Sequence, residues 1–152
     1  DHYLIDQVRG RMDFVETLKA FVALAAKYPQ ALLKLVEDKA NGPAILSVLK
    51  TKLPGLVAVE PFGSKEARAA AVEPLFAAGN VVFPHETDAV YPDGRRGAPW
   101  VPELVHEATT FPNAAHDDQV DAMTQYLNHV AQRGGELLEA AMANLESMFG
   151  GG

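Results

Sequence analysis

The sequence predicts an α/β fold in which a largely parallel sheet is covered by helices. Segments with the composition of strands alternate with segments that have helical spacing as far as residue 83, and further helices follow. Such alternation requires crossover connections, which set consecutive strands parallel and place helices on the sheet faces. We expect about four strands, fewer than the average of about five or six, so further strands are expected from a preceding N-terminal segment.

Length and composition favour one globular domain. The chain has 152 residues, of which 48% are hydrophobic and 22% are charged, values typical of a folded domain. No apolar run reaches the roughly 18 residues of a membrane-spanning helix, and the first residues lack the pattern of a signal peptide. We therefore expect a protein that is neither secreted nor in a membrane. The absence of cysteine excludes disulfides, thiolate metal sites and cysteine nucleophiles.

The net charge of −7 argues against a protein that coats nucleic acid. Such proteins bind through lysine and arginine side chains that release counterions. An acidic protein can still act on nucleic acid when its carboxylates hold metal ions. The charge therefore leaves a metal-dependent nuclease open.

Strands are expected where short apolar runs meet turn residues, and helices where apolar residues recur every three or four positions. The expected strands are residues 3–9, 32–36, 56–59 and 81–83. The expected helices between them are residues 14–28, 42–52 and 65–79. Asp13 and Glu16 have the pattern of a capping box, and Ser64 can cap the third helix, in which Pro74 predicts a kink or a split.

The remaining chain is predicted to be a loop followed by helices. Residues 84–99 are rich in proline and glycine and expose Arg95 and Arg96. Helices are expected over residues 100–110 and 116–132, and Gly134-Gly135 is expected to end the second one. We accordingly divide the chain into a main domain, residues 1–133, and a C-terminal amphipathic helix with a glycine tail, residues 134–152. The apolar stripe of that helix comprises Leu138, Ala141, Met142, Leu145 and Phe149. It lacks the basic face of a membrane anchor, which favours docking on protein.

Two acidic groups stand where α/β proteins place their ligands. Glu37 and Asp38 follow the strand of residues 32–36, and Asp117, Asp118 and Asp121 open the helix of residues 116–132. Asp118 and Asp121 are three residues apart and share one helical face. Clustered carboxylates favour magnesium or manganese over zinc, and two such ions can drive hydrolysis of a phosphodiester.

The same residues have structural interpretations. Aspartates at a helix start cap free N–H groups and complement the helix dipole, and the pair at residues 37–38 is also typical of a turn after a strand. Two cations, Lys65 and Arg68, share one face of a predicted helix and suit a phosphate backbone, as do Arg95 and Arg96 in the loop. A solvated surface accounts for these cations equally well.

Four segments, in this order, resemble the C-terminal nuclease domain of the large terminase subunit of tailed bacteriophages. They are YLIDQVRGR (residues 3–11), LVEDKANG (35–42), KEARAAAVEPLFAAG (65–79) and FPNAAHDDQVDA (111–122). The resemblance covers about residues 3–130. It implies a ribonuclease H-like mixed sheet flanked by helices, and a hydrolase that cuts concatemeric double-stranded DNA during genome packaging.

In that family, acidic residues from three places hold two Mg²⁺ or Mn²⁺ ions. The resemblance assigns the second place to Glu37 and the third to the pair Asp117 and Asp118. It favours Asp118, because related resolvases use a D-x-x-D pattern that Asp118 and Asp121 reproduce; Asp121 is then a further ligand. The first place, an aspartate on the first strand, precedes the matching segment in the family, and Asp6 corresponds to a non-catalytic position. We therefore expect a domain that lacks its first strands and the N-terminal ATPase, as in a prophage-derived copy, and that cleaves DNA poorly alone.

The resemblance also implies partners. These are double-stranded DNA, held by Lys65, Arg68, Arg95 and Arg96, and the portal and small terminase subunit, in the cytoplasm of the bacterial host. Two other functions fit the sequence. One is a non-catalytic interaction module whose C-terminal helix binds a partner or a second copy, and the other is a resolvase-like nuclease that acts on branched DNA.

Overall fold

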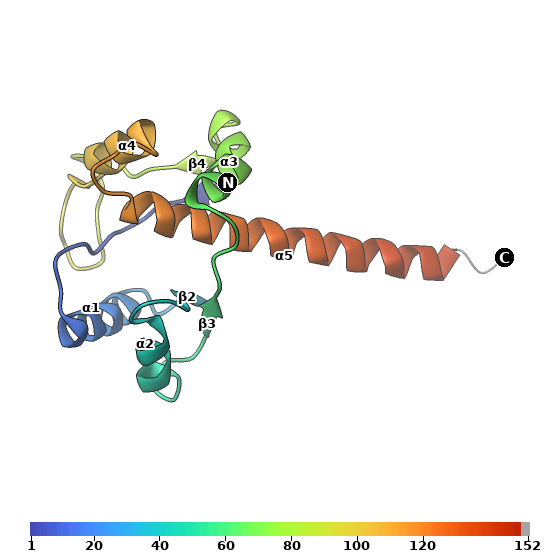
Figure 1. Ribbon diagram of the computed structural model, residues 1–152, viewed down its shortest axis with the longest axis horizontal. Helices are drawn as coiled ribbons and strands as arrows, with labels where there is room; N and C mark the ends of the chain where they lie inside the picture. Colours follow the sequence, from blue (N-terminus) through green and yellow to red (C-terminus); the bar gives the residue numbers. More distant parts are fainter. Residues whose placement is uncertain (150–152) are drawn as a thin grey trace. The chain divides into compact units, whose positions relative to one another are not determined.

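The computed structural model describes the backbone of residues 1–149 and the side chains of residues 1–143. Its elements are those of a mixed α/β fold, as the sequence predicts (Figure 1). The chain divides into two compact units, one made of Asp1–Phe62 with Gly79–His106 and the other of Gly63–Ala78 with the chain from Glu107 onward. Each unit is described by itself.

The first unit contains the strands. It comprises β1 (His2–Tyr3), α1 (Phe14–Lys27), β2 (Lys34–Glu37), α2 (Gly42–Leu49), β3 (Leu56–Val59) and β4 (Val81–Val82). β1 pairs with β4, and β2 pairs with β3 over their full length, both in parallel. The predicted parallel pairing is therefore confirmed. In the described chain these pairs form two separate two-stranded sheets rather than one continuous sheet.

The predicted first strand, residues 3–9, is wrong beyond its start. Leu4 still donates its backbone N–H to the Val82 carbonyl at 2.9 Å, but β1 itself ends at Tyr3. The side chains of Ile5 and Val8 are about half exposed, at 54% and 49%. Apolar residues in this segment therefore have little sheet surface to cover. The Asp6 carboxylate accepts the Gln7 N–H at 2.9 Å.

Local signals place α1 and α2 as predicted. The Asp13 carboxylate accepts the Glu16 N–H at 2.8 Å, and the Glu16 carboxylate accepts the Asp13 N–H at 2.9 Å, which confirms the capping box. A core of Val36, Ile45 and Leu49 joins β2 to α2, and α1 packs against it through Phe14, Leu18 and Phe21. α2 begins at Gly42, where a Cβ atom would lie 1.7 Å from the carbonyl oxygen of Glu37. Only glycine fits this close approach.

The second unit is helical. It consists of α3 (Lys65–Ala77), the end of α4 (Val101–Thr110) and α5 (Asp118–Phe149). α3 packs alongside the first half of α5 (Figure 1). Val72, Val120, Met123 and Leu127 are the buried apolar residues of this unit.

α3 begins and continues largely as its sequence predicts. Ser64 caps it by accepting the Ala67 N–H at 3.2 Å. Pro74 lies inside α3 but does not split it. The helix ends only three residues later, so the proline removes one hydrogen bond near a terminus rather than breaking a long ladder.

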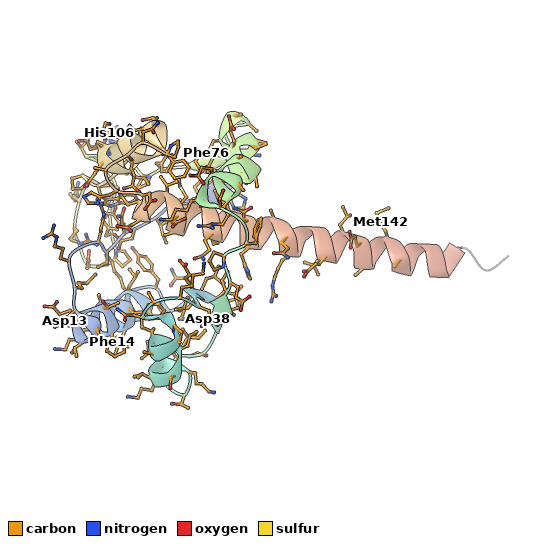
Figure 2. All side chains as sticks on the ribbon, viewed as in Figure 1. Asp13, Phe14, Asp38, Phe76, His106 and Met142 are labelled. Atoms are coloured by element: carbon orange, nitrogen blue, oxygen red, sulfur yellow. The ribbon has the colours of Figure 1, made fainter. Side chains whose placement is uncertain are left out.

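α5 differs from the sequence prediction because it runs through Gly134 and Gly135 as one helix. A glycine inside a helix costs about 1 kcal/mol relative to alanine, a cost that the neighbouring strong helix formers outweigh. From Ala131 to Ala143 every side chain is exposed, including Met142, which Figure 2 labels. The predicted stripe members Leu145 and Phe149 and the tail Gly150–Gly152 lie outside the described side chains. None of the described helices combines the length and the hydropathy needed to cross a membrane.

Candidate functional site

Two of the predicted acids meet at the start of α5, around one lysine. Lys65, the first residue of α3, places its Nζ 2.8 Å from Asp117 Oδ2 and 2.9 Å from Asp121 Oδ2. Arg68, one turn further along α3, places its Nη2 2.6 Å from Asp121 Oδ1. Since Asp117 and Asp121 are four residues apart, they lie on the same side of the helix start. These four side chains are called the α3–α5 charge cluster below.

The charges of this cluster stabilise one another. Burial raises the pKa of Asp121, but the hydrogen bonds from Lys65 and Arg68 outweigh it and leave that pKa below its ordinary value. Hydrogen bonds to Asp117 and Asp121 likewise raise the pKa of Lys65. The Asp121 carboxylate is therefore held in its ionised form.

Lys65 and Arg68 differ in how firmly they are held. Arg68 is 6% exposed; its Nη1 donates to the Gly63 carbonyl at 3.2 Å, and its own carbonyl accepts from Asn128 Nδ2 at 2.9 Å. Its Nε is buried without a hydrogen-bond partner in the described part of the chain. The Lys65 side chain, in contrast, is 43% exposed. DNA binding by Lys65 and Arg68 stays a prediction. In the structure, both side chains form ion pairs with carboxylates at the start of α5.

The start of α5 is capped by a residue that sequence reasoning missed. Glu107, on α4, accepts the backbone N–H groups of Gln119 at 2.8 Å and Val120 at 3.0 Å through its Oε1, and the Gln119 amide at 2.6 Å through its Oε2. Glu107 is 4% exposed. A buried carboxylate therefore supplies the cap that Asp117 and Asp118 were expected to supply, while Asp118 itself is exposed.

The other predicted acids, Glu37 and Asp38, lie at the end of β2 in the first unit. Asp38 donates its N–H to the Val59 carbonyl at 2.9 Å, which continues the ladder one residue past the strand. Glu37 is half-buried, and Asp38 is exposed (Figure 2). The predicted buried strand of residues 32–36 is therefore wrong at its start: β2 begins at Lys34 and includes Glu37, Leu32 and Leu33 are 84% and 49% exposed, and within β2 only Val36 is buried.

The donor set of the α3–α5 charge cluster suits a hard divalent cation. Two carboxylates converge on one positive group, and oxygen ligands of this kind select magnesium or manganese. Among the described residues, however, no group of three or more His, Asp or Glu side chains is arranged to hold a metal ion. In the structure, the two carboxylates of the cluster are paired with Lys65 and Arg68.

One of the predicted loop cations, Arg95, belongs to a second cluster, in the first unit. The Asp6 carboxylate, with its side chain 2% exposed, lies 2.7 Å from Lys27 Nζ and 3.1 Å from Arg95 Nη2, and it accepts the Tyr28 hydroxyl at 2.9 Å. Asp93 contacts Lys27 and Arg95 as well. Arg95 therefore ties the loop to α1, whereas Arg96 is an exposed residue paired with Val90 in an isolated β-bridge.

Parallel strands joined through helices, with acids at a strand end and at a helix start, define a mixed α/β domain consistent with the ribonuclease H-like class. The family model described as the terminase RNaseH-like domain matches residues 2–130, and the chain belongs to this family. This confirms the resemblance and gives the chain a terminase nuclease-type role. Comparison with curated proteins found no match, and comparison with solved structures found none either.

Proposed function

We propose that this chain is the metal-dependent endonuclease part of a phage terminase large subunit, which cuts concatemeric double-stranded DNA during packaging. The observation that carries the proposal is the convergence of Asp117 and Asp121 on one cation, within the segment that matches the family. Glu37 and Asp118 would be the principal ligands of Mg²⁺ or Mn²⁺, with Asp117 and Asp121 in support. The bound ions would activate water and stabilise the leaving oxygen.

The chain's own residues prepare this chemistry. Glu107 fixes the first turn of α5, which carries Asp118 and Asp121. Arg68 holds one oxygen of Asp121 and leaves the other for a cation. DNA-backbone contacts are proposed for Lys65, Arg68, Arg95 and Arg96. The portal and the small terminase subunit are proposed partners, in the cytoplasm of the bacterial host.

Calorimetric titration of the 152-residue chain with Mn²⁺ tests the ligands. We expect Asp118→Ala and Glu37→Ala each to weaken binding at least about tenfold, since loss of a ligand should exceed the effect of losing its supporting contacts. Asp88→Ala, which removes an exposed loop carboxylate (side chain 79% exposed), is the matched control and should bind as the wild type does. Asp118→Ala with unchanged affinity would contradict the proposal.

A double-mutant cycle then asks whether Glu37 and Asp118 serve one site. Two ligands of the same ion are coupled, so the double variant should lose less than the sum of the two single losses. Cleavage of linear DNA with Mn²⁺ completes the test. In line with the resemblance, we expect weak cleavage that Asp118→Ala abolishes.

A second function is favoured by the exposed half of α5. Leu137, Leu138 and Met142 are 72%, 62% and 53% exposed, and exposed apolar side chains on one element favour a protein interface. In this alternative the chain is an interaction module that binds a partner or a second copy through α5. Sedimentation over a range of concentrations should then show self-association that Leu138→Glu removes, whereas a mass that does not depend on concentration argues against a second copy.

A further inference from the structure

We infer that the exposed half of α5 pairs with the same segment of a second copy of this chain, with the two helices antiparallel. The pairing rests on the second function proposed above, in which α5 is an interface, and it specifies the partner and its orientation. The segment comprises residues 131–143 and follows the stretch of α5 that packs on α3 (Figure 1). Every side chain in this segment is exposed.

One face of the segment continues the buried stripe of α5. Leu127 is fully buried in the second unit. Ala131, Gly134, Leu138 and Ala141 follow it at alternating spacings of four and three residues. This is the heptad spacing at which one helix packs along another over several turns. The four residues after Leu127 are called the α5 seam below, and another helix is needed to cover it.

The charges of the segment allow a second copy of this acidic chain to approach the seam. Arg133, Glu136 and Glu139 lie about 100° or more around the helix from Leu138, because successive residues are about 100° apart. Like charges therefore do not meet when two seams face each other. Leu138 and Met142 are 62% and 53% exposed and lie one turn apart on the seam side, so pairing removes apolar surface from water.

The sizes of the seam residues select the antiparallel orientation. In a parallel pair each seam residue meets its own copy, so leucine faces leucine and glycine faces glycine. The glycine layer then leaves a void, which costs packing energy. When one helix is reversed about the point between residues 139 and 140, Leu138 faces Ala141 of the second copy. Gly134 then stands opposite position 145, where the sequence repeats leucine after seven residues. These layers each combine a large residue with a small one.

Disulfide formation in single-cysteine variants of the full chain tests the orientation, because the sequence contains no cysteine. Ala131→Cys, Ala140→Cys and Ala141→Cys make the same small change at exposed positions. In the antiparallel pair, the two copies of residue 141 are offset along the axis by about 4.5 Å, which a disulfide can span, and those of residue 131 by about 25 Å. Ala140 lies on the face opposite the seam and is the matched control. We expect a disulfide-linked dimer from Ala141→Cys alone.

Sedimentation equilibrium measures how the seam contributes to affinity. Leu138→Ala leaves two small residues facing each other in two layers of the pair, and should weaken dimerisation at least about tenfold. Adding Ala141→Leu to Leu138→Ala restores one large and one small residue in each of these layers, and should regain most of the affinity. Leu32→Ala removes an 84% exposed leucine of the first unit, and should dimerise as the wild type does.

The outcomes separate the antiparallel pairing from the proposed interface. If the mass of the wild type does not depend on concentration, self-association through α5 is wrong and the pairing falls with it. If the chain self-associates but Ala141→Cys forms no disulfide, or Ala131→Cys or Ala140→Cys forms one as readily, the antiparallel pairing is wrong and the interface stands. A double variant that stays as weak as Leu138→Ala would likewise contradict the predicted layers.

Discussion

Replacing Glu107 by alanine removes the carboxylate that holds the start of α5. The backbone N–H groups of Gln119 and Val120 then lose the acceptor that lies 2.8 and 3.0 Å from them. The site is buried, since Glu107 is only 4% exposed in the wild type. A hydrogen bond to a charged group contributes about 1.5 kcal/mol or more, so the two together predict a loss of about 3 kcal/mol in the free energy of unfolding. This exceeds the roughly 1 kcal/mol of an ordinary helix cap, because the orphaned groups are buried.

Urea denaturation, combined with amide hydrogen exchange, measures this loss and locates it. The Gln119 and Val120 amides should exchange faster in Glu107→Ala than in the wild type, and Glu107→Gln, which keeps one acceptor oxygen, should fall between them. Glu103→Ala is the control on the same helix: its side chain is 65% exposed and pairs with Arg9, so we expect less than about 0.5 kcal/mol. Unchanged exchange of both amides in Glu107→Ala would refute the capping role.

Two further predictions concern the first unit, and a third concerns α5. Gly42→Ala pushes a methyl group against the Glu37 carbonyl. It should lower the free energy of unfolding by about 2 kcal/mol and weaken Mn²⁺ binding. At Gly134 an added methyl group meets nothing within 4 Å, so Gly134→Ala should stabilise α5 by about 1 kcal/mol. Burial raises the pKa of Asp6, but hydrogen bonds, led by the one from Lys27, outweigh it and lower that pKa overall. The ionised Asp6 carboxylate therefore adds to the free energy of unfolding above about pH 4, and this stabilisation is lost as the pH falls further. Urea titrations at pH 6 and pH 3 should show a smaller loss of stability for Asp6→Asn than for the wild type; equal losses would exclude Asp6 as a source of acid sensitivity.

Features that depend on neighbouring residues were predictable from the sequence. The capping box of Asp13 and Glu16 spans four residues, and Ser64 caps α3 within the same distance. The strand of residues 56–59 has the predicted ends, because a short apolar run between turn residues has few other conformations. The family was predictable from four short segments, and its match over residues 2–130 confirms it.

Features that depend on distant contacts were not predictable. Glu107 caps amides twelve and thirteen residues further along the chain, and no local pattern indicates this pairing. Lys65 and Asp117 are 52 residues apart in the sequence, and only the packing of α3 on α5 brings them together. Arg68 has the pattern of a surface cation, yet it is buried by that same packing.

α5 is one continuous helix, but the free energy needed to unfold it locally differs between its two ends. The acidic end is held by the Glu107 cap and by the burial of Val120, Met123 and Leu127. From Ala131 to Ala143 the side chains are exposed, so helix stability there depends on local propensity, which Gly134 and Gly135 lower. Unwinding that begins in the exposed half therefore costs little and stops at the first buried turn. Opening of the exposed half of α5 therefore leaves its acidic end, with Asp118 and Asp121, in place.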